Sequence, residues 1–168
     1  MKTLKTLSIF ALAAFLSNGA FAQENADVAV SATVEAALVL TPTAVALGTI
    51  QTAEASIIDA NANDDATEAN LGTGAAAGSI QIQGTSGASI DVSWTNATLD
   101  NGSDPTTFTP SVWNGASELT TPAGTTVTLT GGDITIDVGG ELAATSGTGT
   151  YNTSTGSGSP ITFTVSYN

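Results

Sequence analysis

The residues Val28–Leu40 alternate between apolar and small or polar side chains along their whole length. Because a strand turns successive side chains to opposite faces, this alternation predicts one long β-strand with an apolar face and a wet face. At about 3.3 Å per residue the strand would extend over about 43 Å, more than twice the length of a common strand. We therefore expect part of it to lie beyond the domain that follows, where it can complete the sheet of another protein.

The start of the chain is typical of a secretion signal. Lys2 and Lys5 form a basic start, and the apolar run that follows, Leu7–Leu16, is too short to span a bilayer. Ala20-Phe21-Ala22 is a small-x-small cleavage site. We predict that residues 1–22 are a cleavable signal peptide and that the mature chain follows it directly. An uncleaved anchor helix is the alternative.

Charge and missing residue types restrict the chemistry of the mature chain. It has 15 acidic side chains and no basic ones, because both lysines of the sequence lie in the signal. Such a chain has nothing with which to neutralise phosphates, so we exclude nucleic acid as a partner. The sequence has no cysteine and no histidine, which removes disulfides, a lipid anchor, and the commonest general base and metal ligand. We predict that the protein is not an enzyme.

Paired carboxylates are the remaining catalytic option. Asp133 and Asp137 lie four residues apart in one predicted strand, which places them about 13 Å apart on one face. Glycoside hydrolysis needs two carboxylates about 5–9.5 Å apart. The sequence has no nucleophile elbow and no phosphate-binding loop with its lysine. We therefore predict no catalytic residues and interpret both aspartates as part of the solvent-facing side of a strand.

Short runs of period 2 recur along the rest of the chain, and turn residues such as Gly131-Gly132 separate them. Several short strands at this spacing predict an all-β fold, an antiparallel β-sandwich over residues 36–168. The segment Ala53–Ala69 is expected to be mostly loop, with at most a short helix. The apolar residues of the runs are Ile80 and Ile82; Ile90, Val92 and Trp94; Val127 and Leu129; Ile134, Ile136 and Val138; and Ile161, Phe163, Val165 and Tyr167.

Five short motifs follow one another as Leu47–Ile50, Gly84–Ile90, Val138–Leu142, Gly149–Tyr151 and Phe163–Asn168. In them the chain resembles a family of bacterial secreted domains of unknown function that are often grouped with fimbrial subunits. More loosely, it resembles the subunits of chaperone–usher pili. The resemblance implies an immunoglobulin-like, pilin-like sandwich, exported through the periplasm to the surface or a fimbrium of a Gram-negative-type bacterium. Two long segments depart from the family pattern, Asp59–Glu68 and the inserted loop Asn152–Ser159.

The leading segment suits donor-strand complementation, in which the N-terminal extension of one subunit fills a groove between the sheets of the next. We assign residues 23–35 to this extension. Ala36–Leu40 would then be the first strand of the chain's own domain, Pro42 would end it, and Val45–Ile50 would resume it on the other sheet. The side chains expected to fill the neighbour's groove are Val28, Val30, Ala32 and Val34.

The last predicted strand is expected to form one edge of that groove. Its core-facing residues are Ile161, Phe163, Val165 and Tyr167. We predict a structural subunit of an extracellular filament or surface layer that polymerises with itself. The resemblance adds a periplasmic chaperone and an outer-membrane usher as partners, and we expect no membrane insertion of the mature chain. The alternative is a self-contained monomer that acts as a secreted or periplasmic binding module.

One acidic loop partly matches a calcium site. Asp59, Asn61, Asn63 and Asp65 alternate along it, as oxygen ligands of a hard cation do. The sixth loop position is Asp64 instead of glycine, so the loop is not an EF-hand. A solvated loop without metal is the first interpretation, and a looser site in a calcium-stabilised adhesin is the alternative. No other cofactor is predicted.

The larger aromatic residues Trp94, Phe108 and Trp113 raise one further question. We expect them to pack in the core or at its rim, as such side chains do in most small domains. The alternative is a carbohydrate-binding platform, which would need the three rings to be exposed on one face.

Overall fold

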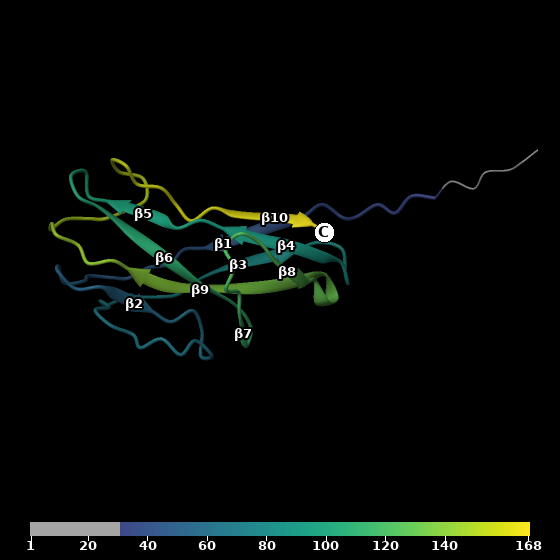
Figure 1. Ribbon diagram of the computed structural model, residues 1–168, viewed down its shortest axis with the longest axis horizontal. Helices are drawn as coiled ribbons and strands as arrows, with labels where there is room; N and C mark the ends of the chain where they lie inside the picture. The colour runs from purple at the N-terminus through teal and green to yellow at the C-terminus, as the bar shows by residue number, and fades with distance from the viewer. Residues whose placement is uncertain (1–30) are drawn as a thin grey trace, which may run out of the picture. The chain divides into compact units, whose positions relative to one another are not determined.

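The described part of the computed structural model, residues 31–168, consists of β-strands joined by turns and loops (Figure 1). The only helical element among these residues is a 3₁₀ turn, η1 (Thr130–Gly132). The prediction of an all-β fold is therefore confirmed. The strands are β1 (Val39–Thr43), β2 (Ser56–Ile58), β3 (Gly78–Gln83), β4 (Ser89–Trp94), β5 (Ala97–Asp100), β6 (Pro105–Asn114), β7 (Ser117–Glu118), β8 (Thr125–Thr128), β9 (Asp133–Leu142) and β10 (Phe163–Tyr167).

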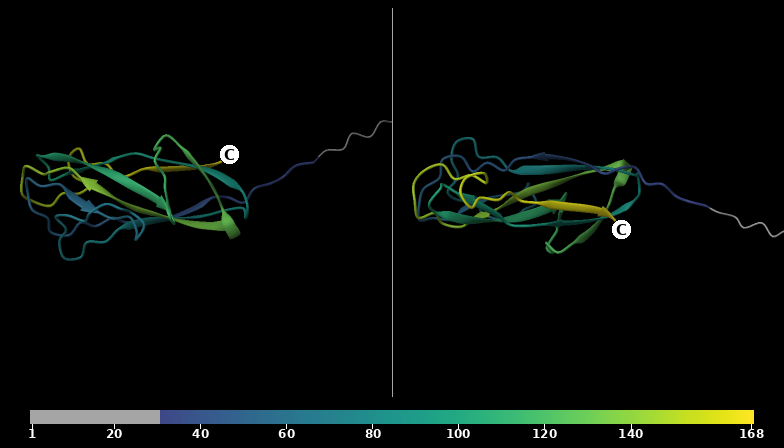
Figure 2. Two further views of the ribbon diagram at one scale, coloured as in Figure 1. Left: turned by 60° about the horizontal axis from the view of Figure 1, so that its bottom comes forward. Right: turned by 90° about the horizontal axis from the view of Figure 1, so that it is seen from above.

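All strand pairs are antiparallel and form two sheets within one compact unit, Glu35–Asn168. The larger sheet has the order β1-β3-β9-β6-β5, with β2 beside β9 and β7 beside β6, and the smaller has the order β10-β4-β8. Ile82 and Ile136 from the larger sheet share one buried cluster with Ile90 and Val92 from the smaller. The unit is thus sandwich-like, with its apolar core between two layers (Figure 2).

The runs of period 2 correspond to strands of the structure. They lie in β3, β4, β8, β9 and β10, with Leu129 and Ile161 just outside the ends of their strands. Alternation predicts these strands well because each has one face on the core and one in solvent. The segment Ala53–Ala69 is mostly loop, as predicted, and contains the short strand β2 in place of a helix.

β6 was not predicted, although with ten residues it is as long as β9. Phe108 and Val112 are its two fully buried apolar side chains, and Pro110 lies between them. A proline in mid-strand normally argues against a strand, because it cannot donate a backbone hydrogen bond. In β6 this proline lies opposite Gly140 of β9. The two strands approach so closely that a Cβ at Gly140 would lie 2.2 Å from the Thr109 carbonyl oxygen. Pairing with β9 therefore outweighs the weak local signal.

The first strand differs from its prediction. β1 begins three residues late, at Val39, and it continues through Pro42. The proline is tolerated because β1 is an edge strand. The predicted crossing of Val45–Ile50 to the other sheet is wrong, because Ala46 bridges Ala76 antiparallel, in the register that β1 keeps with β3. The chain thus stays on the edge of the larger sheet.

Candidate strand-binding groove

A groove of about 780 Å³ lies between the edges of the two sheets. One wall is the segment Pro42–Ile50, and the other is the approach to β10, with Ile161 and Phe163. Phe108 and Leu142 are among the buried apolar side chains of its floor. The groove therefore has a mainly apolar lining, and it lies between the β1 edge of the larger sheet and the β10 edge of the smaller sheet.

β1 leads into one wall of the groove, which Pro42 and Thr43 at its end help to line. In the described part of the chain its one hydrogen-bonded neighbour is β3, so its second edge is free. Leu40 pairs with Ile82, which has no exposed surface, and so faces the interior. Leu40 is nevertheless 37% exposed, so the sandwich does not fully cover the inner face of its first strand.

β10 lines the other side with its first residue, Phe163, and among residues 31–168 it pairs with β4 alone. Its inward side chains lie opposite buried residues of β4, for example Val165 opposite Val92. The predicted edge residues pack against the core but remain only half-buried: Ile161, Phe163, Val165 and Tyr167. The structure therefore brings these four residues together on the inner face, at an edge that its own strands leave open.

The residues predicted to fill a neighbour's groove are only partly described. Val28 and Val30 lie outside the described residues. Ala32 and Val34 are described, have no regular secondary structure and are exposed, Val34 by 89%. Two of the four predicted side chains are thus free of contacts that would bury them, and the assignment of residues 23–35 as a donor strand stays a prediction.

The chain enters the sandwich at Ala36. Its N–H donates to Thr85 Oγ1 at 2.7 Å, and its carbonyl oxygen accepts a hydrogen bond from Tyr167 Oη at 2.7 Å. The Thr85 N–H in turn donates to Tyr167 Oη at 2.8 Å. This contact lies at the end of the unit where β10 ends, near the C-terminus in Figure 1. It was not predicted, because Ala36 and Tyr167 are 131 residues apart in the sequence.

The loop 146–159 closes the opposite end of the groove, which Tyr151 helps to line. Asp104 Oδ2 accepts hydrogen bonds from the N–H groups of Ser146 and Gly147, at 3.0 and 2.9 Å, and from the hydroxyl of Tyr151. The Tyr151 hydroxyl and these bonds to Ser146 and Gly147 lower the pKa of Asp104 to about 2. The same carboxylate raises the pKa of Tyr151.

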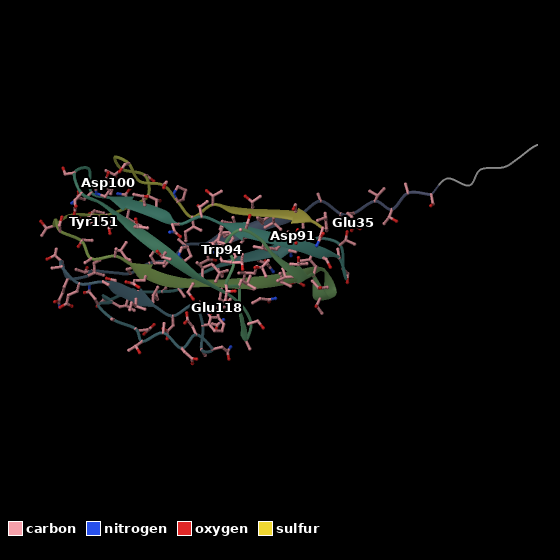
Figure 3. All side chains as sticks on the ribbon, viewed as in Figure 1. Glu35, Asp91, Trp94, Asp100, Glu118 and Tyr151 are labelled. Carbon is pink, nitrogen blue, oxygen red and sulfur yellow. The ribbon has the colours of Figure 1, made fainter. Side chains whose placement is uncertain are left out.

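Asp100 holds the far part of this loop in the same way. One of its carboxylate oxygens accepts the N–H and the hydroxyl of Ser157, at 2.8 and 2.9 Å. Bonds from the backbone of Ser157 and of Gly102 lower the pKa of Asp100. Figure 3 shows Asp100 and Tyr151 at the same end of the unit. The long loop seen in the sequence is therefore a fixed wall of the groove.

The acidic loop uses its polar atoms in hydrogen bonds within the protein. Asn61 Oδ1 accepts the N–H of Asn63 at 2.9 Å, and Asn61 Nδ2 donates to Asp137 Oδ2 at 2.8 Å. The carboxylate that ties the loop to β6 is Asp64, through Ser111 Oγ, and not the predicted Asp65. Of the four predicted ligands Asp59, Asn61, Asn63 and Asp65, one has a buried oxygen without a hydrogen-bond partner, Asp59 Oδ1. Within residues 31–168, no group of three or more His, Cys, Asp or Glu side chains is placed to hold a metal.

The aromatic residues do not share a face. Trp94 and Phe108 are buried, and the Trp94 ring lies 6.3 Å from that of Phe163. Trp113 is half-buried on β6 beside Asp137 of β9, and its indole N–H donates to Ser111 Oγ at 2.8 Å. The interpretation of these residues as core and rim packing thus agrees with their positions.

Comparisons of the chain with protein-family models, with curated proteins and with solved structures found no match. Among the described residues, no helix is both long enough and apolar enough to cross a membrane. The groove between the sheet edges is therefore the feature from which a function can be inferred.

Proposed function

We propose that this protein is the exported structural subunit of a surface filament and that it polymerises by donor-strand complementation. Residues 23–35 of one copy would lie as a strand in the groove of the next copy. One observation carries the proposal: the two strands beside the groove each have a free edge, and their inward apolar side chains are left partly uncovered. An added strand could bond to such edges through its backbone and fill the groove with alternate side chains.

The dimensions and chemistry of the extension support this proposal. Val28–Val34 would span about 23 Å as a strand, the length of an ordinary strand. If its four apolar side chains were fully buried, the gross gain would approach about 5–10 kcal/mol. Such a polymer needs neither disulfides nor ion pairs, which suits a mature chain without cysteine or basic residues.

The finer assignments belong to the same proposal. An immunoglobulin-like, pilin-type sandwich is supported by the antiparallel sheets and by the groove at the last strand. A signal peptide over residues 1–22 and a place at the bacterial surface are supported by the sequence pattern of the first residues. A periplasmic chaperone and an outer-membrane usher are further proposed partners, since a groove of this kind needs cover before assembly.

The test uses the alternation of the extension itself. Val30→Asp with Val34→Asp places charges on the face that would enter the groove, and we expect polymers to be lost. The matched control, Ala29→Asp with Thr33→Asp, adds the same charge to the other face and should leave polymers intact. Light scattering after size-exclusion chromatography and electron microscopy measure the outcome.

Two results would contradict the proposal. One is normal filaments from the Val30/Val34 variant. The other is a mature wild-type chain that stays monomeric at high concentration, which would favour the alternative of a monomeric binding module. A groove of about 780 Å³ lies within the range of small-molecule sites, so that alternative has a physical basis.

A further inference from the structure

Two hydroxyl groups hold the point where the N-terminal extension joins the sandwich. Thr85 Oγ1 accepts the N–H of Ala36, and Tyr167 Oη donates to the carbonyl of Ala36, both at 2.7 Å. Thr85 and Tyr167 are also joined to each other, through the Thr85 N–H at 2.8 Å. We name these three residues the Ala36 latch. Both backbone polar groups of Ala36 are bound by side chains from distant parts of the chain.

One side of the latch packs against the core. Leu38, two residues after Ala36, packs against the core cluster. Beside it, a Cβ at Gly84 would lie 2.5 Å from Tyr167 Oη and 2.9 Å from Leu38 Cδ2. Glycine at this position therefore lets the tyrosine hydroxyl and the leucine side chain meet. Tyr167 and Thr85 are thus half-buried, although Ala36 and its two hydrogen bonds are exposed.

The position of the latch bears on which groove an extension can reach. Ala36 lies at the end of the unit where β10 ends, and β1 runs from there toward its own groove, which it reaches at Pro42. To enter that same groove, the extension would have to reverse direction, and the residues next to Ala36 are those where a reversal would leave the longest stretch to insert. Two-residue hairpin turns favour Gly, Asn or Asp, because these residues adopt positive φ at little cost. Residues 33–37, Thr-Val-Glu-Ala-Ala, contain none of these.

We infer that the Ala36 latch directs the extension to the groove of a second copy and prevents it from folding back into its own. This inference rests on the proposed function. A reversal at residues 35–37 would have to break the bonds that Ala36 makes with Thr85 and Tyr167. Thr85 and Tyr167 are thus positioning residues, which act on the extension through Ala36 and do not need to touch the inserted strand.

The absence of cysteine makes a direct test possible. Val30→Cys in the extension and Leu47→Cys in the groove wall are introduced together into the full mature chain, which is then oxidised. A disulfide within one chain gives a monomer on a non-reducing gel, and disulfides between chains give a ladder. Tyr167→Phe and Thr85→Val each remove one hydroxyl of the latch in this background. Ser166→Ala removes an exposed hydroxyl of the same strand and is the matched control.

With the latch intact, and in the control, we expect a ladder. Each latch variant should raise the ratio of cross-linked monomer to ladder by roughly 2- to 10-fold in dilute solution, the effect of one hydrogen bond on an equilibrium. General destabilisation would also raise this ratio, because cysteines at positions 30 and 47 of an unfolded chain pair readily with each other. Each variant must therefore keep the melting temperature of the control, and a rise in the ratio that only accompanies unfolding would overturn the latch. If the ratio of cross-linked monomer to ladder is the same in the double-cysteine chain, the two latch variants and the Ser166→Ala control, the inference about the latch is wrong. The proposed function is unaffected by that result. No cross-link at all, or only cross-linked monomer with the latch intact, would overturn the proposed function and the latch together.

Discussion

Asp104 shows how a carboxylate can stabilise a loop of this protein through hydrogen bonds, without an ion pair to a basic side chain. Its carboxylate accepts hydrogen bonds from two backbone N–H groups and a tyrosine hydroxyl of the loop 146–159. Such bonds favour the ionised form and so lower the pKa of the carboxyl group. The sequence does not predict this contact, because Asp104 and Tyr151 are 47 residues apart and Tyr151 lies in a loop without a regular pattern.

Protonation of Asp104 at low pH should therefore weaken the hydrogen bonds that hold the loop 146–159. The pKa of Asp104 is about 2 in the folded protein and 3.8 for an ordinary aspartate. Its stabilising effect is fully present above about pH 4 and is lost as the pH falls through about 2, because a depressed pKa means that the unfolded chain takes up the proton first. We expect Asp104→Asn to lower the melting temperature at pH 7 and to match the wild type near pH 2.

The control for this titration is Asp133→Asn, which changes an exposed carboxylate at the start of β9. Its melting temperature should follow that of the wild type throughout. Thermal unfolding at pH 7, 4 and 2 measures the effect. A constant difference between Asp104→Asn and the wild type at all three values would contradict the assignment.

At the scale of elements, β1 and β10 differ from the other long strands. β3, β9 and β6 have hydrogen-bonded neighbours on both sides, whereas β1 and β10 each have a neighbour on one side within residues 31–168. Edge strands of this kind are open to pairing with another chain. Among residues 31–168 no lysine lies on these two edges, and Pro42 of β1 is the one residue on them that cannot donate a backbone hydrogen bond.

Hydrogen exchange should report this difference. In the monomer, we expect amides of β1 and β10 to exchange faster than those of β3 and β9, because local opening of an edge strand breaks fewer contacts. In polymers, or after addition of a peptide of residues 23–35, amides at the free edges of β1 and β10 should become protected. Mass spectrometry after peptic digestion measures both states. Protection confined to other strands would place the contact elsewhere on the molecule.

On the scale of the whole molecule, charge opposes assembly. The sequence has 15 acidic residues, and its two basic residues both lie in the first five positions. If those are removed, every pair of subunits repels, and no complementary charges guide one to the other. The attraction between subunits must then come from burial of apolar side chains and from backbone pairing.

Polymerisation should consequently accelerate with salt. The screening length falls from about 30 Å at 0.01 M to about 8 Å at 0.15 M ionic strength, so repulsion between approaching subunits weakens strongly over that range. Light scattering of the mature chain at a fixed concentration measures the rate. A rate that falls as salt is added would indicate electrostatic attraction and would contradict this account of assembly.

The sequence by itself determined the class of fold and five of the strands, because a strand with one face on the core must alternate, and this alternation is visible locally. It also determined the charge and the exclusions that follow from missing cysteine and histidine. The tertiary structure alone decided β6, the path after Pro42, the wall built by the loop 146–159 and the bonds to Ala36. These features depend on contacts between residues far apart in the sequence, and such contacts leave no periodic pattern along the chain.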